Sequence, residues 1–125
     1  MRLGDAAETT RVISAEDMSE YAALTQQADV ADRVPEPLIG ALFSYLLGVR
    51  LPGQGANYLK QEIRFHRVAH VGETLTARVE ITRIRPEKHL VDLSTTCTDE
   101  AGRLIASGRA LVSARDVAAE LEAHD

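Results

Sequence analysis

Cysteine and tryptophan are scarce in this sequence of 125 residues and acidic residues outnumber basic ones, and each of these features excludes a class of protein. Cys97 is the single cysteine, so neither an intrachain disulfide nor a cysteine-rich zinc site can form. With no tryptophan and only 2 Phe and 3 Tyr, the core must be mainly aliphatic. The net charge of −5 argues against nucleic acid or an anionic membrane surface as the main partner, because both attract basic proteins.

Motifs of several well-known sites are missing as well. The sequence has no P-loop, no dinucleotide-binding fingerprint and no Gly-x-Ser-x-Gly elbow. Its 4 histidines show no metal-ligand spacing, so we expect no metal and no separate cofactor. The first residues hold no apolar stretch of the signal-peptide kind, and the length suits one domain covering residues 1–125. We therefore expect a single-domain cytoplasmic protein.

The most apolar run of the chain covers residues 37–49 and points apolar side chains in nearly every direction of a helix. Such a helix must be buried on most sides. It is too short to cross a bilayer, which needs about 20 apolar residues, so no membrane span is expected. Pro37 suits the first position of this helix, where its missing N–H costs nothing.

Alternating apolar and polar residues predict strands over most of the remaining chain. Leu75, Ala77, Val79 and Ile81 share one face of such a strand, and the alternation slips at Arg83-Ile84, which indicates a bulge. Ser14 reads as the N-cap of an amphipathic helix. The expected strands cover 8–14, 56–67, 73–85, 89–98 and 103–114, and the expected helices 15–27, 37–49 and 116–121.

These elements predict an α+β protein in which an antiparallel sheet wraps around the central helix. In the 56–67 strand, Leu59, Ile63 and Phe65 form the apolar set and Gln61 is its one polar member. A sheet this small leaves edges exposed, and pairing of two copies would hide them. We therefore predict a homodimer, with a dimer of dimers as a further alternative.

One stretch resembles a known family. Residues 51–65 match the pattern Leu-Pro-Gly-x-Gly-x-x-Tyr-x-x-Gln-x-x-x-Phe of the MaoC-like hydratases, the (R)-specific enoyl-CoA hydratases of the hot-dog superfamily. Residues 71–75 resemble the family's next strand, 99–102 its last hairpin and 3–17 its N-terminus, so the resemblance covers most of 3–113. It implies a hot-dog fold with 37–49 as the central helix, and an acyl-CoA thioester as the ligand, with coenzyme A entering as part of the substrate.

The acid–base residues of the family are missing from this sequence. Family members carry Asp-x-Asn-Pro-x-His, whose Asp and His activate water and protonate the α-carbon. Without a gap, Gln27 stands at the Asp position and Asp32 at the His position, and a neutral Gln takes no proton near neutral pH. The family's Ile-x-His-Gly, which begins the central helix and polarises the thioester carbonyl, is replaced at its His-Gly by Ile39-Gly40.

Three carboxylates are candidate catalytic residues. Asp29 and Asp32 precede the central helix and act either as surrogate acid–base groups or as a solvated loop with local caps. Glu36 lies at the helix start, where its anion is stabilised; it is either a base or only a partner of the helix dipole.

Substrate-binding candidates lie on both sides of the central helix. Ile39, Gly40 and the first-turn N–H groups would receive the thioester carbonyl, although Gly40 also suits close helix–sheet packing. Gln61 would line the acyl or pantetheine tunnel, or hydrogen-bond across the dimer. The resemblance adds four residues of the matched pattern: Pro52, Gly53, Gly55 and Tyr58. Basic residues of the middle of the chain are either phosphate contacts or a solvated face: Arg64, His66, Arg67, His70, Arg83, Arg85 and Lys88.

Three functions remain open at this point. The first is an acyl-CoA hydratase or dehydratase, a lyase with a rewired acid–base site. The second is a non-catalytic acyl-CoA-binding protein or a subunit whose hydratase-like partner supplies the missing residues. The third and weaker one is an acyl-CoA thioesterase.

Overall fold

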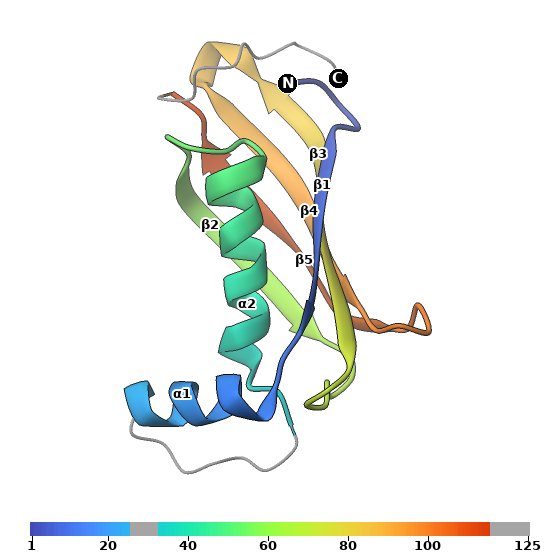
Figure 1. Ribbon diagram of the computed structural model, residues 1–125. Helices are drawn as coiled ribbons and strands as arrows, with labels where there is room; N and C mark the ends of the chain where they lie inside the picture. Colours follow the sequence, from blue (N-terminus) through green and yellow to red (C-terminus); the bar gives the residue numbers. More distant parts are fainter. Residues whose placement is uncertain (26–32, 116–125) are drawn as a thin grey trace.

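The computed structural model describes residues 1–25 and 33–115 and shows one antiparallel sheet with a helix lying along it (Figure 1). The sheet has 5 strands in the order β1-β3-β4-β5-β2, so β1 and β2 form its edges. Helix α1 lies across the end of α2 at which α2 begins (Figure 1). The strands are β1 (Ala6–Val12), β2 (Asn57–Phe65), β3 (Thr74–Arg85), β4 (Leu90–Thr98) and β5 (Leu104–Ser113), and the helices are α1 (Ala15–Thr25) and α2 (Glu36–Tyr45).

The expected α+β arrangement is confirmed, as are the five strands and the central helix, with ends shifted by one or a few residues. A π-helical turn, Leu46–Arg50, extends α2, with Leu51 N–H donating to the Leu46 carbonyl at 2.8 Å. Leu46 and Leu47, at the start of this turn, are both buried in the core. The helix expected over 116–121 and the last residues of the one expected over 15–27 lie outside the described residues.

The core lies between α2 and the inner face of the sheet. From α2 and its π-helical turn come Ile39, Leu42, Phe43, Leu46 and Leu47, and the inner face adds Leu75, Ala77, Val79, Ile81, Val91, Leu93 and Cys97. The expected facing of β3 is therefore confirmed. A register shift between Ile81 and Arg83 confirms the bulge and returns Ile84 to the core.

Cys97 is a small residue of the core. Its side chain is fully buried in β4. Burial, helped by the nearby Asp99 carboxylate, raises the pKa of the Cys97 thiol to about 11. The thiolate, which is the reactive form, is therefore scarce near neutral pH.

The central helix is not covered all round within one copy of the chain. Ala41, Ser44, Tyr45 and Gly48 are exposed on the side of α2 and its extension that turns away from the core. The expectation of burial on most sides is thus met only toward the sheet, because a single five-stranded sheet covers one side of a helix.

Leu59 is the clearest correction to the expected facing of β2. It is 56% exposed, although the alternating pattern placed it in the apolar set. A bulge between Tyr58 and Lys60 shifts the register, so that Tyr58 pairs with the inward-facing Val112. Local alternation does not reveal such an extra residue, because the bulge depends on pairing with β5.

Among the described residues, no helix is long and apolar enough to cross a membrane.

Candidate active site

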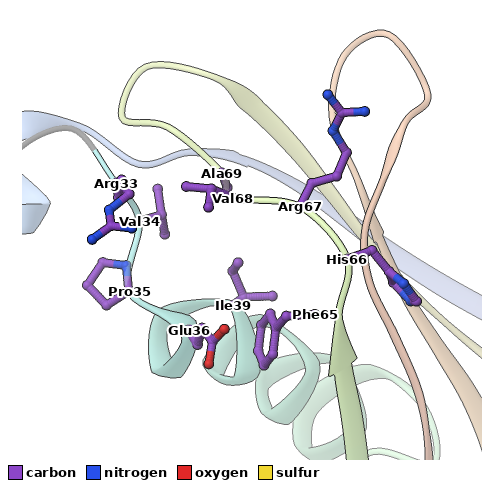
Figure 2. A pocket seen from close by; sticks show the side chains of 10 residues that line it. All are labelled: Arg33, Val34, Pro35, Glu36, Ile39, Phe65, His66, Arg67, Val68 and Ala69. Atoms are coloured by element: carbon purple, nitrogen blue, oxygen red, sulfur yellow. The ribbon is translucent and has the colours of Figure 1, made fainter.

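A cavity of about 430 Å³ opens where α2 begins (Figure 2). Its walls come from the chain before α2, from the first turns of α2 and from the connection after β2. The lining residues are Arg33, Val34, Pro35, Glu36, Ile39, Phe65, His66, Arg67, Val68 and Ala69.

Backbone contacts join the chain before α2 to the connection after β2. Val34 N–H donates to the Ala69 carbonyl at 2.8 Å, and Arg33 and His70 form an isolated antiparallel bridge. Pro35 is extended at φ −61° and ψ 141°, and α2 begins directly after it. The residues before the helix are therefore fixed against the chain that follows β2.

The first turn of α2 offers one backbone donor near the cavity. Pro37 has no N–H, and Leu38 N–H donates to the Pro35 carbonyl at 3.0 Å. Glu36 N–H has no partner within the described part of the chain. A free N–H at a helix start can donate to an anion or a polarised carbonyl.

Gly40 lies deeper in the helix, and the cavity lining does not include it. As the fifth residue of α2, its N–H falls in the range that bonds within a helix. A Cβ added to Gly40 would lie 3.8 Å from the Cδ1 atom of Ile63 in β2, which is ordinary packing distance. Its position is that of a helix–sheet contact.

Among the residues that the structure describes, Glu36 is the one carboxylate of the cavity lining. In Figure 2 its side chain lies beside Phe65 and below Ile39, whereas His66 and Arg67 point away from the cavity. His66 instead contacts Ser107, with Nε2 and Oγ 2.7 Å apart. The described part of the lining is therefore mostly apolar with one acidic group, which suits an acyl chain and one proton-transfer step.

The other predicted substrate-binding residues lie toward the far end of α2. Pro52 and Gly53 are buried in the loop after the π-helical turn, where the Leu51–Pro52 peptide is cis. Gly53 N–H donates to the Leu47 carbonyl at 3.0 Å, and Gly53 and Gly55 both have positive φ, at 96° and 98°. These residues shape the loop between α2 and β2.

Tyr58 and Gln61 lie on β2. Tyr58 hydrogen-bonds to Ser44 of α2, and its partial burial raises the pKa of its hydroxyl. Gln61 is exposed at the middle of the strand. Of the predicted site residues, Glu36 and Ile39 line the cavity, as do His66 and Arg67 of the basic candidates. Asp29 and Asp32 lie outside the described residues.

Several cavity residues were not predicted from the sequence as parts of a site. Phe65 ends the matched pattern, which was a usable signal. Val34 and Ala69 have no such signal in the sequence, because only the backbone hydrogen bond between them brings them together. No group of three or more His, Cys, Asp or Glu in the described ranges could hold a metal ion.

Comparisons with known proteins show which proteins this chain is similar to. No protein-family model matches the chain. An (R)-specific enoyl-CoA hydratase of Rhodospirillum rubrum is 34% identical over 123 residues, covering 87% of this chain and 85% of the relative. An (R)-specific enoyl-CoA hydratase of Aeromonas caviae is 41% identical over 75 residues, covering 60% of this chain and 56% of the relative.

Solved structures show the same relationship. The (R)-hydratase of A. caviae, involved in PHA biosynthesis, superimposes with a TM-score of 0.83 at 31% identity, covering 90% of this chain and 96% of its own. The R-hydratase PhaJ1 of Pseudomonas aeruginosa also gives 0.83, at 26% identity, covering 100% of this chain and 92% of its own. The chain therefore belongs to the (R)-specific enoyl-CoA hydratase family, the MaoC-like acyl-CoA hydratases and dehydratases with the hot-dog fold.

Proposed function

We propose that this protein binds an enoyl-CoA or 3-hydroxyacyl-CoA thioester in the cavity at the start of α2 and interconverts the two with a rewired acid–base site. One observation carries the proposal: in a chain of the hydratase family, Glu36 is the one carboxylate among the described residues of a mostly apolar cavity, and it lies beside a free helix N–H. The usual Asp and His of the family motif are replaced in the sequence, so a different base is needed.

Glu36 would act first as the base. Its carboxylate accepts a proton from water while the water oxygen bonds to C3 of the enoyl thioester. The same carboxyl group then returns the proton to C2, which completes hydration without any further reactant. Asp29 and Asp32 are the alternative bases proposed from the sequence.

A non-catalytic role is the second candidate, and Ile39 is the observation that favours it. This buried aliphatic side chain stands where the family places a His and lines the cavity next to Glu36. A protein of this kind would bind acyl-CoA without turnover, or would need a hydratase-like partner subunit. A thioesterase that uses Glu36 is a weaker alternative.

We also propose that the protein is a homodimer. Strand β2 forms one edge of the sheet, and most of its residues are exposed. A second copy would cover this edge. Assembly into a dimer of dimers and the cytoplasmic location stay predictions from the sequence.

Hydration of crotonyl-CoA and of a longer enoyl-CoA, followed as loss of the enoyl-thioester absorbance, tests the proposal. We expect Glu36→Gln to lower turnover by about 100-fold or more, the usual contribution of a general base. Asp29→Asn and Asp32→Asn test the alternative bases, and Glu100→Gln, in the exposed β4–β5 turn, is the matched control.

The outcomes separate the candidates. Turnover that survives in Glu36→Gln but falls in one of the Asp variants would move the base to that residue. Absence of turnover in a wild-type protein that crotonyl-CoA stabilises against heat would indicate a binding or partner-dependent role. A wild-type protein that shows no turnover and is not stabilised by crotonyl-CoA would refute the proposal.

A further inference from the structure

A groove of about 480 Å³ crosses strands β2, β5 and β4 outside the cavity described above. In these strands Ile63, Gly108 and Thr95 pair in one row, and Thr95 is buried on the face that packs against α2. Side chains alternate along a strand, so the residues on either side of this row point to the outer face of the sheet, away from α2. The outward-facing residues of the groove are Glu62, Arg64, Ser94, Thr96, Ser107 and Arg109.

Short hydroxyl side chains form the floor of this outer groove, and long charged side chains form its edge. Ser94, Thr96 and Ser107 are half-buried, whereas Arg64 and Arg109 are exposed. Arg64 lies directly opposite Ser107, and Arg109 follows Ser107 by two residues on the same strand. Diagonal neighbours of this kind are about 7–8 Å apart, so two arginine side chains can reach one ligand between them.

The charges along β2 favour an anion in the outer groove. Lys60 Nζ and Arg109 Nη2 each lie 3.6 Å from a carboxylate oxygen of Glu62, so one carboxylate serves two cations. Arg64 forms no ion pair with any residue of the described ranges. The positive charge here is therefore in excess, although the whole chain has a net charge of −5. Such an excess attracts anions.

The charged neighbours on β3 and β4 add little to this excess. Arg78 and Glu80 form an ion pair at 2.8 Å, and Arg85 and Asp92 form another at 2.8 Å. These guanidinium groups already have carboxylate partners. The guanidinium groups available to a ligand in the outer groove are thus those of Arg64 and Arg109, at its β2 side.

His66 extends the outer groove past the end of β2. Its side chain points away from the cavity (Figure 2), and its Nε2 lies 2.7 Å from Ser107 Oγ. When Nε2 carries the hydrogen, Ser107 accepts this hydrogen bond. The hydroxyl hydrogen of Ser107 is then left to donate to a ligand.

We propose that the outer groove binds the phosphate group of a small phosphorylated molecule. Arginine binds phosphate through two parallel, charge-assisted hydrogen bonds, which neutral side chains cannot match. Arg64 and Arg109 would hold the phosphate oxygens from the β2 side, and the hydroxyls of Thr96 and Ser107 would donate from the floor. The volume leaves room for the rest of a small molecule. This site lies outside the cavity and does not depend on the proposed function.

Titration with inorganic phosphate tests the site, followed by the backbone amide chemical shifts of the labelled full-length protein. The signals of Arg64, Thr96 and Ser107 should shift saturably, while those of Val34 and Glu36 at the cavity stay unchanged. Arg64→Gln should raise the dissociation constant about tenfold or more, because a hydrogen bond to a charged group is lost. Arg11→Gln, on the opposite edge strand β1, is the matched control and should leave the constant unchanged.

Glu62→Gln provides a test with the opposite sign. Its carboxylate repels a phosphate group and competes with it for Arg109. Removing this charge should therefore lower the dissociation constant for phosphate about threefold, the range expected for an exposed ion pair. A substitution that merely disturbed the sheet would not tighten binding.

Crotonyl-CoA distinguishes two sources of the phosphate group. If the phosphates of coenzyme A occupy the outer groove, crotonyl-CoA should shift the signals of the groove and the cavity together, and Arg64→Gln should weaken its binding. If a separate phosphorylated molecule is the ligand, crotonyl-CoA should leave the groove signals unchanged while inorganic phosphate shifts them. Both results support the site.

Three results would overturn the proposal. The first is that inorganic phosphate produces no saturable shift at Arg64, Thr96 and Ser107, or shifts only the cavity signals. The second is an Arg64→Gln variant that binds phosphate as the wild type does. The third is equal weakening by Arg64→Gln and Arg11→Gln, which would show a general effect of charge without a site.

Discussion

Asp99 is a buried carboxylate that organises the turn between β4 and β5. It accepts hydrogen bonds from Arg103 N–H at 2.9 Å, Ala101 N–H at 3.0 Å and Arg103 Nε at 2.9 Å. The hydrogen bond from the Arg103 backbone, followed by those from Ala101 and the Arg103 side chain, holds the pKa of Asp99 below its ordinary value of 3.8. The charged form is thus favoured in the folded protein.

Lowering of this pKa predicts a specific pH dependence. Below pH 3.8 the unfolded chain binds a proton at this residue before the folded chain does, so folding stability is lost as pH falls from 3.8 toward the lower folded value. We expect Asp99→Asn to lower the free energy of unfolding at neutral pH, and this difference from wild type to shrink below pH 3.8. Urea denaturation of the wild type and of Asp99→Asn, from neutral pH to below pH 3.8, measures this difference in the free energy of unfolding, with Glu100→Gln as control. A difference that stays constant with pH would contradict the argument.

Gly108 shows how one residue permits the close approach of two strands. It lies in β5 opposite Ile63, and a Cβ atom at this position would overlap the carbonyl oxygen of Glu62 in β2. The obstacle is backbone within the sheet, which cannot move aside as a flexible side chain would.

Gly108→Ala should therefore destabilise the β2–β5 pair. We expect a loss of about 1–3 kcal/mol in the free energy of unfolding, the usual range for overpacking. Gly48→Ala is the matched control, because no atom lies within 4 Å of its added Cβ. Urea denaturation measures both variants, and equal stability of the two would refute the strand contact.

At the scale of the whole molecule, folding and assembly should be linked. One copy leaves an edge strand and apolar side chains of the central helix exposed, and dimerisation would bury them. Binding between folded copies stabilises the folded state by mass action. The melting temperature of the wild-type protein should therefore rise with protein concentration, as differential scanning calorimetry would show. A melting temperature independent of concentration would contradict this linkage.

Much of the fold follows from local patterns. The two-residue alternation of β3 and β4 specifies which side chains face the core, because neighbouring residues of a strand point to opposite sides. The bulge near Arg83 was visible as a slip in that alternation, and the turn at Gly102, with φ 79°, required a residue free to adopt positive φ. The bulge at Leu59 was not visible, since it arises from pairing with a distant strand.

By itself the sequence determined the helices and strands, the apolar central helix and the family resemblance, since each is written in neighbouring residues or in a motif. Tertiary structure alone decided that β2 is an edge, that Val34 meets Ala69, and that Glu36, Ile39 and Phe65 border one cavity. These features depend on hydrogen bonds and packing between segments far apart in the chain. Such contacts form only when the whole sheet closes on α2, so no local pattern encodes them.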